Sequence, residues 1–260
     1  MRRIWRTVLP SVRTSSRRLP GILTWALFAS ATPVFAAHPM LTEDTGTQGI
    51  GNFELELGYS QAHDDGARIG ELGPQLSYGA LDNLDLIVRP TWLHVRSAPT
   101  NMTSQGFGDT GLDFKWRFPG QGALTFGVRA GVALPTGDAD KELGKGKASP
   151  HAILIATWLA DPWMFSANLD YVYDPLIGDR RNLSGASAVA AYSANDVWRF
   201  TAEVGTAMNP DPSRASWLTV ARFGVIATVL KGLDVDAGYQ VRLTRAAPAE
   251  IVLAGVTLHW

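Results

Sequence analysis

Charged side chains that alternate with apolar ones are the residues of this sequence best placed to do chemistry. In 108–118, Asp109, Asp113, Lys115 and Arg117 fall on odd positions, while Leu112 and other apolar residues fall on even ones. Charges held along one face could line a hydrated path for solutes or pair with one another. The candidate lumen-lining residues with this spacing are Glu54, Glu56, Glu71, Asp85, Arg89, Asp109, Asp113, Lys115, Arg117, Arg129, Asp170, Arg199, Glu203, Arg222, Asp234, Asp236 and Arg242.

Other chemistry has little support in the residue types. The chain has no cysteine, which excludes disulfides, thiolate metal sites and thiol catalysis. The five histidines lack the spacing of metal ligands, and Gly144-Lys145 lacks the glycine five residues earlier that a phosphate-binding loop needs. We therefore expect no catalytic residue, no cofactor and no metal. A lipid hydrolase stays open as a minor alternative, although His94 and His259 have no serine two residues away.

The elements that must position these charges are β-strands. In 232–244, apolar residues from Leu233 to Leu243 alternate with polar residues from Asp234 to Thr244, and a strand puts successive side chains on opposite faces. Stretches 149–160 and 217–230 are apolar on both faces, so they predict a drier part of the interior. A lysine or arginine facing lipid at mid-depth costs about 2–4 kcal/mol, so the charged faces should point into a lumen.

Connections of alternating length indicate how the strands are joined. Short turns, such as 160–162 and 231–232, alternate with longer polar links, such as 97–107 and 208–216. This pattern, with tryptophans near the short turns and Trp260 at the C-terminus, is typical of outer-membrane barrels. The sequence predicts an all-β fold: a single antiparallel up-and-down transmembrane β-barrel of about 12 strands, with 10 or 14 as alternatives, and both termini on the short-turn side.

The N-terminal residues indicate export. Residues 1–36 contain six arginines, an apolar run at 21–31 and Val34-Phe35-Ala36, which together match a secretory signal peptide cut after Ala36 or Ala37. We expect residues 37–50 to form a periplasmic segment and 51–260 the barrel. Without residues 1–36 the chain carries 17 basic and 24 acidic residues, a net charge of −7, which excludes nucleic acid held by a basic face.

The loop 136–149 is the longest and most charged connection. It could fold inward as a constriction, or it could be an ordinary solvated surface loop. Its Asp138 and Asp140 are too few for a calcium loop.

Three segments carry a family resemblance. They are 42–51 (TEDTGTQGIG), 106–118 (GFGDTGLDFKWRF) and 131–138 (GVALPTGD), the last followed by Leu143-Gly144-Lys145-Gly146. The chain resembles the outer-membrane barrel family labelled for the meta-pathway of phenol degradation. The resemblance implies a β-barrel with a role in uptake and carries over no catalytic residues.

The leading hypothesis is therefore an outer-membrane channel or transporter for passive uptake of small molecules, with aromatic or hydrophobic compounds as candidate cargo. The first alternative is a structural or surface-interaction barrel whose lumen is plugged by its own charges. The expected location is the outer membrane of a Gram-negative bacterium, reached by the general secretory route. The expected partners are outer-membrane lipid, the barrel assembly machinery and a small-molecule solute.

Overall fold

The computed structural model describes residues 39–64, 67–97, 102–120, 122–176, 178–245 and 247–260. The predicted signal peptide, residues 1–36, lies outside the described residues. No helix in the described part of the chain is long and apolar enough to cross a membrane.

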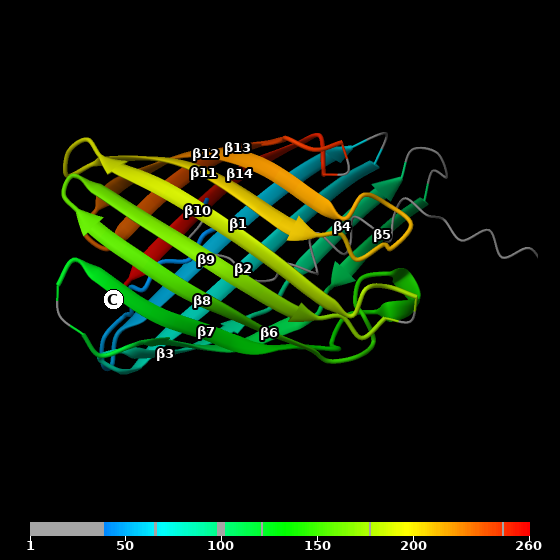
Figure 1. The fold of residues 1–260 in the computed structure, drawn as a ribbon, viewed down its shortest axis with the longest axis horizontal. Coiled ribbons are helices and arrows are strands. Elements are labelled where there is room, and N and C mark those ends of the chain that lie inside the picture. The colour runs from blue at the N-terminus through cyan, green and yellow to red at the C-terminus, as the bar shows by residue number, and fades with distance from the viewer. Residues whose placement is uncertain (1–38, 65–66, 98–101, 121, 177, 246) are drawn as a thin grey trace, which may run out of the picture.

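The described residues form one antiparallel sheet that closes on itself as a barrel (Figure 1). The segments pair in sequence around the ring, although β5 pairs only with β4, and β1 completes the closure because it pairs with both β14 and β2. The segments are β1 (Phe53–Asp64), β2 (Ala67–Leu81), β3 (Leu84–Arg89), β4 (Trp92–Ser97), β5 (Met102–Phe107), β6 (Thr110–Arg117), β7 (Leu124–Leu134), β8 (Ser149–Ala160), β9 (Trp163–Tyr173), β10 (Asn182–Ser193), β11 (Trp198–Met208), β12 (Trp217–Leu230), β13 (Leu233–Arg242) and β14 (Glu250–His259).

Two of the barrel strands are each interrupted once. Strand β2 pairs with β3 along its second half and with β4 along its first half, so β3 and β4 form one crossing that is broken at Pro90-Thr91. Proline has no N–H to donate to a sheet, which accounts for a break at this position. Likewise β5 and β6 form one crossing broken at Gly108-Asp109, because β4 pairs with β5 and β3 with β6. The barrel therefore has 12 crossings, as the sequence predicted.

The two faces of the wall differ as the alternation requires. On β6, Leu112, Phe114 and Trp116 are exposed on the outer surface, whereas Asp113 between them is buried. The interior also contains buried apolar side chains where the sequence is apolar on both faces, including Ile153 on β8. The outside is consequently an apolar band suited to lipid, and the inside is mixed and largely polar.

Aromatic pairs mark the short-turn end of this band. Near the short turns, Phe53 stacks on Trp260 and Trp163 lies against Tyr192. The C-terminus lies at this same end (Figure 1). We orient the short-turn end toward the periplasm and the long-loop end toward the outside, as in barrels of this kind.

Candidate functional site

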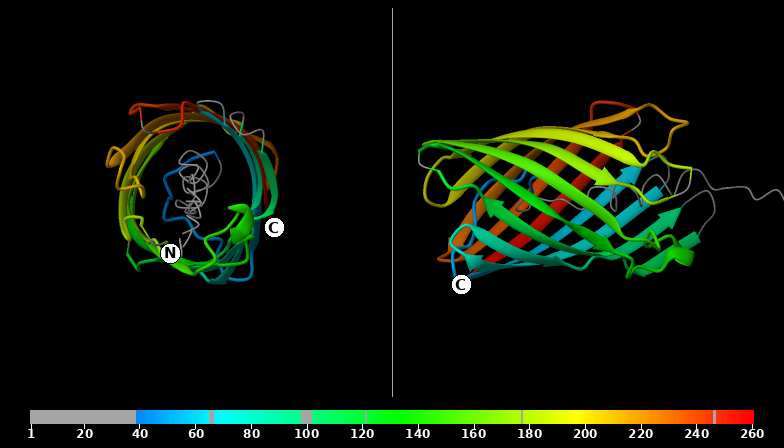
Figure 2. Two further views of the ribbon diagram at one scale, coloured as in Figure 1. Left: turned by 90° about the vertical axis from the view of Figure 1, so that its right-hand side faces the viewer. Right: turned by 60° about the horizontal axis from the view of Figure 1, so that its bottom comes forward.

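The N-terminal segment 39–50 runs inside the barrel, and we call it the plug segment. Figure 2 shows it crossing the middle of the lumen when the barrel is viewed along its axis. The sequence predicted a periplasmic segment at 37–50; residues 39–50 lie in the lumen instead, and residues 37 and 38 are outside the described residues. The expectation was wrong because the plug segment has no strand periodicity, so its sequence gave no sign of the wall contacts that hold it. Pro39 and Met40 are buried, as are Thr42 and Glu43.

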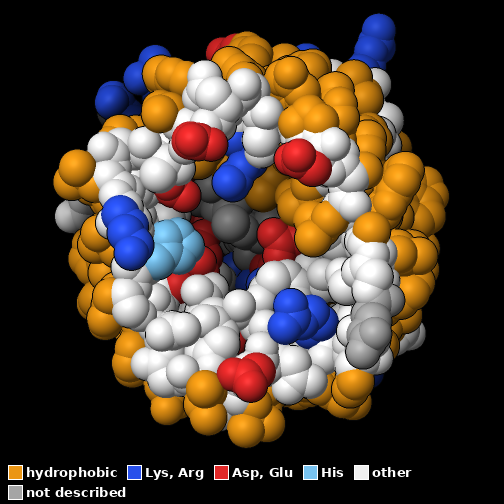
Figure 3. All heavy atoms as spheres, turned by 90° about the vertical axis from the view of Figure 1, so that its left-hand side faces the viewer, with side chains coloured by type: hydrophobic (Ala, Val, Ile, Leu, Met, Phe, Trp, Pro, Cys, Tyr) orange, Lys and Arg blue, Asp and Glu red, His pale blue; other side chains and the backbone are white. Residues whose placement is uncertain are grey.

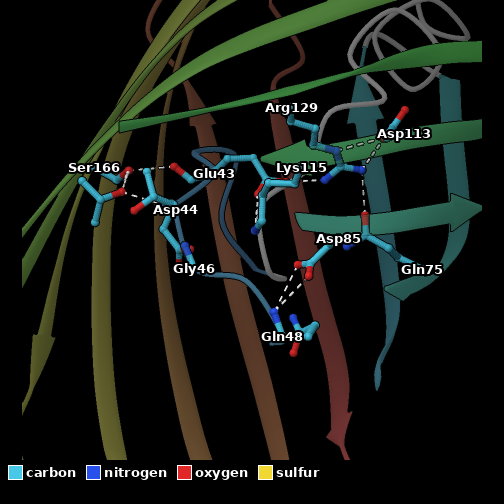
Figure 4. Close-up of polar contacts among 12 residues, drawn as sticks. Glu43, Asp44, Gly46, Gln48, Gln75, Asp85, Asp113, Lys115, Arg129 and Ser166 are labelled. Carbon is cyan, nitrogen blue, oxygen red and sulfur yellow. Dashed lines mark hydrogen bonds and ion pairs between the residues drawn. The ribbon is translucent and has the colours of Figure 1, made fainter. Parts of the chain in front are cut away.

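A buried ionic cluster holds the middle of the plug segment (Figure 4). The Glu43 carboxylate forms an ion pair with Arg129 of β7 and a second one with Lys115 of β6, whose Nζ lies 3.3 Å away. Arg129 is fully buried and also binds Asp113 of β6, with 2.6 Å between Nη2 and Oδ2. The other Asp113 oxygen lies 2.8 Å from Nε2 of His151 on β8. Glu43 therefore joins the plug segment to a network shared by three neighbouring strands.

The cluster is extended by an amide on β2. Gln75 accepts a hydrogen bond from Nη2 of Arg129 at 2.9 Å and donates one to Glu56 of β1 at 2.7 Å. The guanidinium of Arg129 is thus divided among Glu43, Asp113 and Gln75. A buried charge with this many partners is well satisfied, so the network can persist in the lumen at little net cost.

The start of the plug segment is held by the opposite wall. Glu203 of β11 accepts hydrogen bonds from the backbone N–H of Leu41 at 2.7 Å and of Thr42 at 3.0 Å, and from the Thr42 hydroxyl at 3.0 Å. Arg222 of β12 donates to the carbonyl of Pro39 at 2.9 Å. Wall charges therefore satisfy backbone groups that no strand partner reaches.

The end of the plug segment is held near the short turns. The N–H of Thr45 donates to Oγ1 of Thr157 on β8 at 3.0 Å. Ser166 of β9 donates to the carbonyl of Glu43 at 2.7 Å, and Asp85 of β3 accepts from the N–H of Gln48 at 3.1 Å. The plug segment is thus bonded to the wall along its whole length.

Inward-facing glycines make room for the plug segment. A Cβ added at Gly224 of β12 would lie 2.6 Å from Cγ of Pro39, and one added at Gly238 of β13 would lie 2.9 Å from Cβ of Pro39. A Cβ at Gly205 of β11 would lie 3.1 Å from Cδ1 of Leu41. These distances are shorter than ordinary van der Waals contact, so the wall accepts the plug segment only because side chains are absent there.

Cavities flank the plug segment. One of about 80 Å³ lies between Met40 and the wall of β1, β2 and β14, and combines apolar Leu253 with Glu71 and Arg89. Another, of about 520 Å³, opens at the short-turn end, and His259 lies on its wall. Figure 3 shows both acidic and basic side chains around this opening. Met40 of the plug segment lines both cavities.

The loop between β7 and β8 also enters the lumen. Asp109 accepts hydrogen bonds from the N–H of Gly137 at 3.0 Å and of Lys145 at 2.9 Å. Leu143 is buried against Ile69 and other apolar side chains of β2 and β4. The structure combines the two readings of residues 136–149: Leu143 and Lys145 are buried inward, whereas Thr136, 138–141 and 146–148 are exposed. A single apolar residue in a charged loop was too weak a signal to decide between them.

The predicted lumen residues occupy several places. Asp85, Lys115, Arg129, Glu203 and Arg222 contact the plug segment directly, and Asp113 contacts it through Arg129. The residues that line the two cavities are Glu54, Glu56, Glu71, Arg89, Arg199 and Asp234.

The remaining predicted residues lie away from this contact. Asp109 binds the β7–β8 loop, and Arg117 donates to the carbonyl of Asp82 at the short-turn end. Asp236 is buried on β13, Asp170 is half-buried beside Gly185, and Arg242 is exposed at the long-loop end.

Sequence reasoning missed three members of the ionic cluster. Glu43 precedes the first strand, where no periodicity marks it as inward-facing. His151 was considered only as a metal ligand, although its inward position on β8 follows from the register with Gly131 of β7. Gln75 is uncharged and was not considered. No group of three or more metal-ligating side chains occurs within the described ranges, and the cluster is better suited to ion pairing.

Comparisons with solved structures agree with the fold. An outer membrane channel described as COG4313 from Pseudomonas putida F1 superimposes with a TM-score of 0.70, at 14% identity over 84% of this chain and 98% of that chain. KdgM porin superimposes with a TM-score of 0.56, at 8% identity over 78% of this chain and 98% of that chain. No curated protein matches the sequence. At these identities the likeness shows a shared barrel fold.

A family model covers all the strands of the barrel and residues 44–50 of the plug segment. It matches residues 44–260 and is described as "Putative MetA-pathway of phenol degradation". The match extends beyond the three segments that carried the resemblance, through the C-terminal half to Trp260. The chain therefore belongs to this phenol-degradation family of barrel proteins.

Proposed function

We propose that this chain is an outer-membrane channel for passive uptake of small molecules, and that the plug segment closes it reversibly. The observation that carries the proposal is a closed barrel whose lumen is obstructed by a segment that is joined covalently only to β1 and is held to the other strands by hydrogen bonds and ion pairs. Once the segment leaves, Arg129, Lys115, Glu203 and Arg222 line the vacated space. Such a wall would conduct water and polar solutes and would select among them by charge.

The cargo we propose is small and partly apolar. The cavity beside Met40 places apolar Ile251 and Leu253 next to Glu71 and Arg89. A molecule with an apolar body and one polar group would find partners on both sides of that space. This supports aromatic or otherwise poorly soluble compounds as candidate solutes.

A barrel whose lumen stays filled is the second candidate. The satisfied network around Arg129 favours it, because ions that are fully paired have no electrostatic need to separate. In that case the plug segment would be a permanent part of the interior, and the outer loops would carry the function.

The lipid hydrolase finds less support. Within the described residues the side-chain hydrogen bonds and ion pairs join His94 to Gln105, His151 to Asp113, and His259 to Glu54 and Asp234, and none of these partners is a serine. We propose transport and no enzymatic activity. We place the chain in the outer membrane of a Gram-negative bacterium, with export by the general secretory route and insertion by the barrel assembly machinery.

A disulfide lock tests the channel proposal. Cβ of Pro39 lies 2.9 Å from the position of a Cβ on Gly238, and a disulfide needs about 3.5–4.5 Å, so a small shift would allow the bond. The chain has no native cysteine to interfere. The Pro39→Cys/Gly238→Cys variant of residues 37–260 would be recorded in a planar bilayer, oxidised and then reduced, with Pro39→Cys alone as the control.

We expect discrete current steps from the wild type and the single variant, none from the oxidised double variant, and recovery on reduction. Loss of residues 39–50 should give a constantly open channel. A folded wild type that stays silent, together with a silent deletion variant, would overturn the channel in favour of the filled barrel. Equal currents from the oxidised and the reduced double variant would overturn the gating role of the plug segment.

A further inference from the structure

The outer surface of the barrel carries a row of polar residues at the long-loop end. On β1, β2, β4 and β5, residues His63, Arg68, Arg96 and Thr103 lie directly opposite one another in the ladder. They share the outward face with Tyr59, and Arg68, Arg96 and Thr103 are exposed. Figure 1 places β4 and β5 at this end of the barrel.

The row lies at the height of the lipid headgroups. Ten residues separate Phe53, in the aromatic ring at the short-turn end, from His63. At about 3.3 Å per residue and a strand tilt of about 40°, this separation is about 25 Å along the membrane normal. An apolar band of an outer-membrane barrel is also about 25 Å tall. The row therefore meets the headgroup region of the outer leaflet.

The two arginines are unfavourable neighbours by themselves. Arg68 and Arg96 are paired across β2 and β4, so their Cβ atoms are about 4.5–5.5 Å apart. Like charges directly opposite destabilise a sheet. Among the side chains that the structure describes, no carboxylate forms an ion pair with either arginine. The nearest acid in the row is Glu250, which lies beyond His63 and accepts a hydrogen bond from Tyr239 at 2.6 Å.

An anion between the two guanidinium groups would remove this repulsion. Each guanidinium presents a fork of N–H donors that matches the oxygens of a phosphate, and an anionic group held by both would gain two charge-assisted contacts. Aromatic side chains immediately below the row, Tyr59, Trp92 and Phe107, offer apolar surface to an acyl chain. A headgroup phosphate with acyl chains attached fits both features.

We propose that Arg68 and Arg96 form a binding site for the phosphate of an outer-leaflet glycolipid. The chemistry recognised is a phosphate monoester on a lipid-anchored sugar, and His63 and Thr103 flank it as further donors. The site rests on the membrane orientation proposed above, but it does not depend on whether the lumen conducts.

Lipid A provides the probe. The purified barrel in detergent would be titrated with diphosphoryl lipid A, monophosphoryl lipid A, phosphatidylglycerol and inorganic phosphate, with bound lipid counted by native mass spectrometry. The variant is Arg68→Gln/Arg96→Gln. The matched control is Arg181→Gln. It removes an exposed arginine at the same end of the barrel that is not paired with a second arginine across the sheet. Reduced gel mobility on heating would show that each variant folds.

We expect the double variant to weaken the Kd for diphosphoryl lipid A at least tenfold and the control to change it less than twofold, with channel currents unaltered in both. Higher salt should weaken wild-type binding and leave the double variant little changed, since exposed charges are screened. Equal binding by the double variant and the wild type would overturn the site. Inorganic phosphate or phosphatidylglycerol binding as tightly as lipid A would overturn the assignment to a glycolipid.

Discussion

Replacing Glu43 by glutamine should open the channel without harming the barrel. The change keeps the shape of the side chain and removes the charge that joins the plug segment to Arg129 and Lys115. Glutamine can still accept one hydrogen bond from Arg129. The wall itself keeps its pairing, because Asp113 continues to bind Arg129 at 2.6 Å.

The size of the effect follows from what is lost and what remains. Breaking a fully buried ion pair costs about 3–5 kcal/mol when the surviving charge has no other partner. Arg129 has two other partners, and a hydrogen bond to a charged group contributes about 1.5–3 kcal/mol. We therefore expect about 2 kcal/mol less stability of the docked plug segment. At tenfold for each 1.4 kcal/mol, the ratio of open to closed channels rises about thirtyfold.

Open probability in single-channel recordings measures this ratio directly. Asp44→Asn is the matched control, since Asp44 is the adjacent carboxylate and its side chain accepts a local hydrogen bond from the N–H of Gly46 at 2.6 Å. The control should stay close to wild type. If Glu43→Gln and Asp44→Asn have the same open probability as wild type, the ionic cluster does not hold the plug segment closed, and the reasoning fails.

Three further predictions concern other parts of the lumen. Gly238→Leu should raise the open probability, because even its Cβ would lie 2.9 Å from Cβ of Pro39; wild-type currents from this variant would contradict the steric argument. Lys145→Met should release the β7–β8 loop, since it leaves the buried carboxylate of Asp174 without its ion pair at 3.0 Å; faster tryptic cleavage at residues 141 and 147 measures this. Asp179 lies outside the strands, and burial together with nearby carboxylates raises its pKa. The folded loop therefore favours the protonated carboxyl, and this contribution to the stability of the loop is lost as the pH rises through that pKa. Asp179→Asn should therefore slow proteolysis of the 174–181 loop at about pH 7 but not at about pH 4, and equal rates for both proteins at neutral pH would refute this.

The wall of the barrel could be predicted because it follows a period of two. The outward Leu112, Phe114 and Trp116 and the buried Asp113 of β6 were readable from residue type alone, since lipid and lumen impose opposite demands on alternate residues. The interruption at Pro90 did not change the predicted number of membrane crossings, because that number was derived from the turns and loops that join the strands. These demands are local, so a single sequence contains them.

The contents of the lumen could not be predicted in the same way. The plug segment has no period, and its position depends on partners such as Glu203, which lies 162 residues from Leu41 in the chain. Leu143 in the β7–β8 loop presents the same difficulty, because one apolar residue among charges does not reveal the cluster that buries it. Charge balance indicated that the inward residues could pair, but not that Glu43 would be among them.

The long sequence separations within the plug contacts have a consequence for the order of assembly. Its hydrogen bonds to Thr157 and Arg222 span 112 and 183 residues, and they reach two strands, β8 and β12, that are separated by three others. Contacts that close such long loops form late in folding. We expect the barrel to leave its insertion machinery with its sheet closed but its lumen not yet filled by the plug segment. The plug segment, although it is synthesised before the strands, would then dock in the lumen last, and the newly inserted barrel would conduct until it docks.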